Sequence, residues 1–177
     1  MKFENYQIRP VEIKDVANYY LFINENKERI SGYFPSTLSY NKDLESTTAF
    51  ISDRISLWEK KEFLSFVIVD EHTQRIVGTV FLKDFDWNVK RCEFGFFIDG
   101  KYEGKGIISN AVSHVIKWCF SELSLHKIFM RIAIDNTASR RVAEKNNFVA
   151  EGILRDDFKT GEGVLVDIVY YGLLNID

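Results

Sequence analysis

Two glycines around a lysine, in the segment YEGKGIISNAV (Tyr102–Val112), stand directly before an apolar run with helical spacing. A helix N-terminus offers unpaired N–H groups and the positive end of the helix dipole, and glycines let a phosphate approach those groups closely. The same glycines could instead serve only to allow positive φ angles in a tight turn. The GxxxxGK(S/T) loop and the GxGxxG loop are both missing, which argues against the two large nucleotide-binding classes that use them.

Apolar periodicity identifies the elements that must position this glycine loop. We expect strands at 5–11, 62–70, 76–85, 91–99, 127–135, 148–156 and 164–174, and helices at 14–26, 44–58, 107–120 and 136–147. The order β-α-α-β-β-β-α-β-α-β-β is that of an α/β chain with a mixed sheet of about seven strands. The strand before the loop and the strand after its helix should be parallel. Open α/β sheets bind ligands beyond the carboxyl ends of their strands, so the loop after Asp99 lies where a ligand is expected.

Composition narrows the class of protein. A chain of 177 residues with 46% hydrophobic residues suits one well-filled core, and we expect a single domain over residues 1–177. The net charge of −3 argues against a nucleic-acid partner. Cys92 and Cys119 lack metal spacing, which indicates small core residues in a reducing cytoplasm. The start MKFENYQIRP has no apolar signal core, and no run long enough to cross a membrane follows, so we expect a cytoplasmic protein without a membrane partner.

The glycine loop and the later segment IDNTASRRVAEKNNFVAEGILRD together resemble the GNAT superfamily of acyl-CoA-dependent N-acetyltransferases. The family's loop Q/R-x-x-G-x-G/A falls on Glu103–Ile108, where only the central glycine matches strictly. The form G-K-G-hydrophobic is common in the branch of ribosomal-protein N-terminal acetyltransferases (RimJ/RimL type). The pattern N-x-x-S, E-K-x-x-F, E-G and the closing DIVYYGLL also match this branch. The resemblance extends from Ile8 to Leu174.

The resemblance implies a GNAT fold with acetyl-CoA bound where the fourth and fifth strands splay apart. Pantetheine would pair with backbone near Phe96, Phe97 and Ile98, and a main-chain N–H near Phe97 would polarise the carbonyl. The second segment would contribute Asn136 and Ser139. The pyrophosphate would lie on the loop and first helical turn, at Glu103, Gly104, Lys105, Gly106, Ile107, Ile108 and Ser109. The resemblance implies no metal, and the sequence shows no group of metal ligands.

The resemblance also suggests the residues that handle protons. Many family members use a tyrosine seven residues after the family asparagine as the acid, but that position is Ala143 here. Ser139, one turn earlier, would protonate the thiolate instead, unless its hydroxyl is satisfied locally by backbone. Glu93 would accept the amine proton, unless it is only a charge on the outward face of a strand. Asp156 and Asp157 are rival bases.

Acceptor contacts are expected from the loop after the first helix, which often roofs the pocket in this branch. Tyr33 and Phe34 could contact the substrate, with Asn26 and Arg29 nearby, and Trp87 could form a second wall. All five residues could instead be loop packing.

The function expected from this resemblance is transfer of acetyl from acetyl-CoA to a primary amine, foremost a protein N-terminal α-amine such as that of a ribosomal protein. Two alternatives stay open. A small amine, such as a polyamine or a drug, could be the acceptor, or the chain could be a non-catalytic acyl-CoA sensor, which Ala143 would favour. A homodimer is a further expectation, because branch members are often dimers and 15% of the residues are aromatic.

Overall fold

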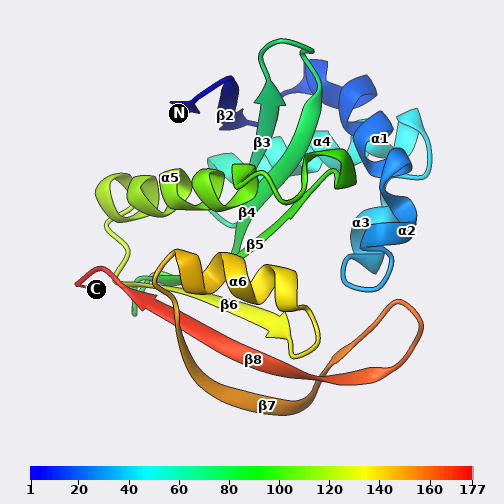
Figure 1. The fold of residues 1–177 in the computed structure, drawn as a ribbon. Coiled ribbons are helices and arrows are strands. Elements are labelled where there is room, and N and C mark those ends of the chain that lie inside the picture. The colour runs from blue at the N-terminus through cyan, green and yellow to red at the C-terminus, as the bar shows by residue number, and fades with distance from the viewer. Residues whose placement is uncertain (177) are drawn as a thin grey trace.

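A computed structural model describes residues 1–176 and contains one open, eight-stranded sheet with helices on both faces (Figure 1). The strands are β1 (Lys2–Phe3), β2 (Tyr6–Pro10), β3 (Leu64–Asp70), β4 (Ile76–Asp86), β5 (Arg91–Ile98), β6 (Lys127–Ala133), β7 (Val149–Lys159) and β8 (Leu165–Leu174). The helices are α1 (Val16–Glu25), α2 (Lys27–Ile30), α3 (Pro35–Ser39), α4 (Leu44–Glu59), α5 (Ile107–Glu122) and α6 (Thr137–Lys145), with short 3-10 turns η1 (Ile13–Asp15) and η2 (Gly100–Tyr102). Across the sheet the strands run in the order β1-β2-β3-β4-β5-β6-β8-β7.

This architecture confirms the expected α/β class and mixed sheet. All seven expected strands and all four expected helices are present. The structure adds β1, α2 and α3, which the sequence did not indicate. Each is too short to show an apolar period: β1 has two residues and pairs with β2, whereas α2 and α3 have four and five residues.

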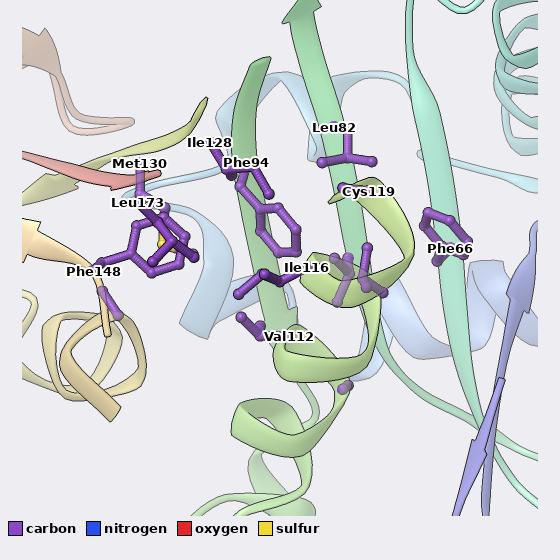
Figure 2. Close-up of a cluster of buried hydrophobic side chains, with 14 of the residues drawn as sticks. Phe66, Leu82, Phe94, Val112, Ile116, Cys119, Ile128, Met130, Phe148 and Leu173 are labelled. Atoms are coloured by element: carbon purple, nitrogen blue, oxygen red, sulfur yellow. The ribbon is translucent and has the colours of Figure 1, made fainter. Parts of the chain in front are cut away.

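Two hydrophobic clusters lie on opposite faces of the sheet. Alternate residues of β5 divide between them: Phe94 belongs to the cluster under α5, whereas Phe97 belongs to the cluster under α1 and α4. Figure 2 shows Val112 and Ile116 of α5 packed toward Phe94. Helix α5 therefore covers β4 and β5 on one face of the sheet, whereas α1 lies against β4 and α4 against β3 on the other face (Figure 1).

Both cysteines are fully buried, as expected of small core residues. Burial raises the pKa of the Cys92 thiol to about 12 and that of Cys119 well above its usual value. Neither side chain is therefore a reactive thiolate at neutral pH. No helix in residues 1–176 is both long enough and apolar enough to cross a bilayer.

The sheet opens between β5 and β6. These strands are parallel, as expected, but pair only through Arg91–Glu93 and Lys127–Phe129 at their beginnings. Beyond this point β5 stays paired with β4, and β6 stays paired with β8 through Ala133. Each strand follows its own antiparallel neighbour, so the carboxyl-terminal halves of β5 and β6 diverge. The expected splay is present.

Candidate functional site

A cavity of about 320 Å³ lies at the splay between β5 and β6. Its walls come from segments far apart in the chain: β3 to β8, the first turn of α6, and the region of α3 and α4. Eight of the residues singled out from the sequence line it: Tyr33, Phe34, Glu93, Phe96, Phe97, Asn136, Ser139 and Asp157. The structure thus brings candidate proton-handling groups from β5 and α6 to one space.

The backbone of β5 presents hydrogen-bonding groups to the splay. The N–H of Asp99 donates to Val77 O (2.8 Å), so the backbone of Phe97, two residues earlier, also faces β4. The N–H and C=O groups of Phe96 and Ile98 consequently point away from β4, to the side that β6 has left. This edge is open to an added strand-like ligand, and its free amides flank Phe97 rather than belong to it.

The glycine loop leads into α5 with two left-handed residues. Gly104 has φ of +70° and Gly106, the N-cap of α5, has φ of +77°. The first helical hydrogen bond runs from Asn110 N to Gly106 O (3.0 Å), which leaves the amides of residues 107–109 without intrahelical acceptors. A β-carbon at either glycine would meet no atom within 4 Å. The glycines therefore satisfy a backbone requirement and also leave open space before a row of free N–H groups, which fits a pyrophosphate.

Asn26 and Arg29 support this loop and do not line the cavity. Buried Asn26 accepts a hydrogen bond from Gly100 N (3.1 Å) and donates to Phe22 O (2.9 Å). Arg29 pairs with Glu103, with Nη1 donating to Oε2 at 2.9 Å. Both side chains thus tie the end of α1 and α2 to the segment between β5 and α5. Their predicted role as acceptor contacts stays a prediction, but their observed contacts position the loop.

Lys105 folds back on the loop. Its Nζ donates to Lys101 O (2.9 Å) and lies 5.1 Å from the centre of the Tyr102 ring. The main-chain amides, and not this ammonium group, are the donors directed at the open space. We therefore expect main-chain groups to carry most of the anion binding.

The first turn of α6 places Ser139 on the cavity. Asn136 caps the helix by accepting from Ser139 N at 3.1 Å. The Ser139 hydroxyl makes no hydrogen bond within residues 1–176, so backbone does not satisfy it locally. Ala143 is fully buried in the core, so its position does not face the cavity. At the end of the helix, Asn146 donates to Ser109 Oγ (3.2 Å), which joins α6 to the first turn of α5.

Glu93 is a buried carboxylate beside two cations. The residue is 7% exposed and lies on the face of β5 opposite Cys92 and Phe94, so it is not a solvent-facing charge. Lys83 Nζ lies 3.3 Å and Arg131 Nη2 3.1 Å from Glu93 Oε2. Burial raises the pKa of Glu93, and the nearby cations oppose that shift without reversing it. A carboxylate with a raised pKa binds a proton more strongly and is therefore a candidate general base.

Of the two rival bases only Asp157 lines the cavity. A register irregularity in β7, between Leu154 and Phe158, turns this stretch of the strand. Asp156 has φ of +52°, is exposed, and its N–H donates to Asp167. Arg131 Nη1 lies 3.6 Å from Asp157 Oδ2 and so connects Asp157 with Glu93.

Three cations of the cavity were missed from the sequence: Arg54, Lys83 and Arg131. Arg131 is the one charged residue inside the apolar stretch IFMRIA, a pattern that could have marked it as a site residue. Lys83 and Arg54 gave no comparable signal, because charged residues are common near strand ends and on helix surfaces.

The segment between α2 and α3 (residues 31–34), called the roofing segment below, closes over the cavity. Tyr33 OH donates to Asp135 (3.2 Å), and the ring of Phe34 lies 5.0 Å from that of Phe97. Gly161, in the turn between β7 and β8, donates its N–H to Gly32 O (3.0 Å). This segment therefore spans both sides of the splay. Trp87 does not line the cavity: it stacks on Phe85 at 4.9 Å and is 42% exposed.

In the part of the chain that the structure describes, no three His, Cys, Asp or Glu residues form a group that could hold a metal ion. The site instead combines a buried carboxylate, a free hydroxyl, an open strand edge and a helix N-terminus. Such groups can accept and donate protons and can stabilise a developing negative charge through main-chain hydrogen bonds.

Comparison with known proteins agrees with this geometry. The family model described as "Acetyltransferase (GNAT) domain" matches residues 6–149. The "Probable N-acetyltransferase YjcK" of Bacillus subtilis (strain 168) is 30% identical over 178 residues, which covers 100% of this chain and 98% of the relative. The ribosomal-protein-serine acetyltransferase of Escherichia coli (strain K12) is 25% identical over 86% of this chain and 83% of its own. The solved structure of the ribosomal-protein-S5-alanine acetyltransferase from Vibrio fischeri superposes with a TM-score of 0.94 at 25% identity, covering 100% of this chain and 97% of that one.

Proposed function

This chain belongs to the GNAT family of acetyl-CoA-dependent N-acetyltransferases, and from that premise we propose that its acceptor is the N-terminal α-amine of a protein, in the manner of the ribosomal-protein acetyltransferases. The observation that carries the proposal is the cavity at the splay. It adjoins the free strand edge of β5 and joins Glu93, Ser139 and the roofing segment in one space. Two of the similar proteins are ribosomal-protein acetyltransferases, which supports this acceptor class.

Acetyl-CoA supplies an activated acyl group on a thioester that an amine can attack directly. The amides of residues 107–109 and the glycine loop would hold its pyrophosphate, and Phe96 and Ile98 would hold the pantetheine arm along β5. Glu93 would accept the amine proton, directly or through water, and Ser139 would donate a proton to the departing sulfur. A free β5 amide flanking Phe97 would stabilise the developing oxyanion.

The charges of the cavity bear on the choice of acceptor. A polyamine site needs uncompensated carboxylates, but Glu93 and Asp157 are paired with Lys83 and Arg131. A third cation, Arg54, also lines the cavity, so the formal charge of the cavity lining is positive. This balance disfavours a polycationic acceptor. A non-catalytic sensor would not need a buried carboxylate and a free hydroxyl facing one space, and this pairing favours catalysis.

Mass spectrometry across a panel of amines tests the proposal. The panel contains peptides with ribosomal-protein N-termini, the same peptides with blocked α-amines, polyamines and aminoglycosides. We expect acetylation of free N-terminal peptides only. Acetylation confined to polyamines or drugs would establish the small-amine alternative. Tight acetyl-CoA binding without any acetylated product would establish the sensor alternative.

We place the reaction in the cytoplasm, where the two free cysteines would stay reduced.

Replacement of Glu93 by Gln should change the pH dependence of the reaction. The raised pKa of Glu93 means that the group is protonated, and inactive as a base, at pH values above the ordinary carboxyl range. In the parent, kcat/KM should therefore rise with pH through this raised pKa, and Glu93→Gln should flatten that limb. We expect a loss of roughly tenfold on the plateau, below the usual range for a positioned base because water can reach the proton. Asp156→Asn, on an exposed side chain outside the cavity, is the control. An unchanged pH profile in Glu93→Gln would remove Glu93 from the mechanism.

We propose that the chain forms a homodimer through the edge strand β7. All but one of the eleven residues of β7 are exposed, and apolar side chains gather there and in the adjoining turn and strand, at Val149, Ile153, Leu154, Val164 and Leu165. Such an edge strand invites pairing with a second copy. Sedimentation at micromolar concentration should show a dimer, and Ile153→Lys should shift the population to monomer. A monomer at all accessible concentrations would contradict the proposal.

A further inference from the structure

Arg54 of α4 is a cation enclosed by aromatic rings at one end of the cavity. Its guanidinium carbon lies 4.6 Å from the centre of the Phe50 ring and 4.1 Å from that of Phe63. Its side chain is 16% exposed. Two rings that hold a guanidinium in this way restrict its plane and leave its N–H groups to be satisfied at the edge of the stack.

The hydrogen-bonding capacity of Arg54 is largely unused. Its Nε is buried and has no hydrogen-bond partner among the described residues. Among the described residues its one ion-pair partner is Asp53, whose Oδ2 lies 3.3 Å from Nη1, and that carboxylate is 58% exposed to water. Burial lowers the pKa of Arg54, yet a guanidinium stays cationic at neutral pH. A buried cation with an unsatisfied N–H is costly unless an anion completes it.

The remaining charges of the cavity do not supply that anion. Five charged side chains line it, and four of them, Lys83, Arg131, Glu93 and Asp157, are paired with one another. The two cations and two carboxylates of this group cancel formally. Arg54 takes no part in this group, and the exposed carboxylate of Asp53 is its one ion-pair partner among the described residues.

Strand register gives the separation between β5 and the backbone next to the ring on which Arg54 stacks. Arg54 stacks on Phe63, which directly precedes β3, and Ser65 of β3 pairs with Phe81 of β4, which pairs with Gly95 of β5. Two strand spacings, about 10 Å, therefore separate the β3 backbone, beside which Arg54 stacks on Phe63, from the β5 backbone. Gly95 keeps this route open to the Phe81 ring, because a β-carbon there would lie 2.3 Å from the ring.

We propose that Arg54 binds a carboxylate of the acceptor, held about 10 Å from the amine that is acetylated; this inference rests on the proposed acetyltransfer to an amine in the same cavity. The amine and carboxylate of a free α-amino acid lie within one residue length, about 3.5 Å, so such a molecule cannot reach both ends. A peptide with an acidic side chain near its N-terminus can, and so can a long ω-amino carboxylate.

Matched acceptor pairs test this inference. One arm uses peptides that differ only by Glu or Gln at the first, second or third position, and the other uses aminoheptanoate and its amide. For the parent protein we expect kcat/KM to favour the carboxylate member by about tenfold, as for a charge-assisted hydrogen bond in a partly wet site. Arg54→Gln should remove the preference, measured as the ratio of kcat/KM for the two members of each pair in the same variant. Arg75→Gln, which removes a surface arginine paired with Glu25, should keep the preference.

The arms also separate this inference from the proposed function. A preference seen only with peptides assigns the carboxylate to an acidic side chain, and one seen only with the ω-amino pair assigns it to a small molecule. If no acceptor is acetylated, the proposed function fails, and calorimetry of the same pairs with CoA-loaded protein still measures the Glu-over-Gln preference. Equal kcat/KM or affinity for the two members of each pair, or a preference that survives Arg54→Gln, overturns the role of Arg54.

Discussion

Gly106→Val is expected to abolish measurable acetyl-CoA binding while the chain stays folded. The β-carbon would project into open space in front of the first turn of α5, where no protein atom lies within 4 Å. That space is where a pyrophosphate must approach the amides of residues 107–109. Each hydrogen bond from an amide to a charged oxygen contributes about 1.5–3 kcal/mol, so blocking two of them should weaken binding roughly 10²-fold or more. Isothermal titration calorimetry measures the loss.

A second effect of the substitution needs its own control. Gly106 has φ of +77°, and a branched residue there is strained whether or not a ligand is present. Gly163, in the turn between β7 and β8, has φ of +86° and lies outside the loop. Gly163→Val should therefore lose comparable stability in thermal unfolding and retain acetyl-CoA affinity. Unchanged affinity in a folded Gly106→Val variant would refute the role of this loop in holding phosphate.

The parts of the site that follow from local pattern were predictable. A glycine pair before an apolar stripe indicates a helix N-terminus, and the structure has Gly106 as the N-cap of α5. The alternation of Cys92, Phe94 and Phe96 indicates a strand with one face in the core, which places Glu93 on the other face. The same pattern could not tell that this other face is covered. Its covering by α1, α4 and the roofing segment depends on contacts between residues far apart in sequence.

Side chains whose role depends on such contacts were not predictable. Asn26 and Arg29 lie next to the roofing segment in sequence, yet they contact Gly100 and Glu103, more than seventy residues later. Arg54 reads as one charge on an amphipathic helix, and only the fold brings Phe63 against it. Local periodicity specifies which face of an element is apolar, but not which element it meets. The place of Arg54 in the cavity therefore became evident only from the structure.

Removal of the Ser139 hydroxyl is expected to cause a large loss of turnover. Ser139→Ala should lower kcat about 10²-fold and leave the acetyl-CoA dissociation constant nearly unchanged. General-acid assistance is worth about 10²–10⁴-fold, and the thiolate of CoA leaves readily enough to expect the low end. The assignment rests on a hydroxyl that lines the cavity and makes no hydrogen bond to the described residues, on a helix where Ala143 can donate no proton.

Two matched variants separate proton donation from helix stability. Thr137→Ala, in the same first turn but outside the cavity, should turn over at the parent rate. Ser139→Thr keeps a hydroxyl and should recover most of the activity lost in Ser139→Ala, which a merely structural role would not require. Single-turnover measurements at saturating acetyl-CoA isolate the transfer step from cofactor release. Parent-like turnover in Ser139→Ala would mean that the thiolate departs unassisted or takes its proton from water, and α6 would then serve to hold the first turn of α5 through Asn146.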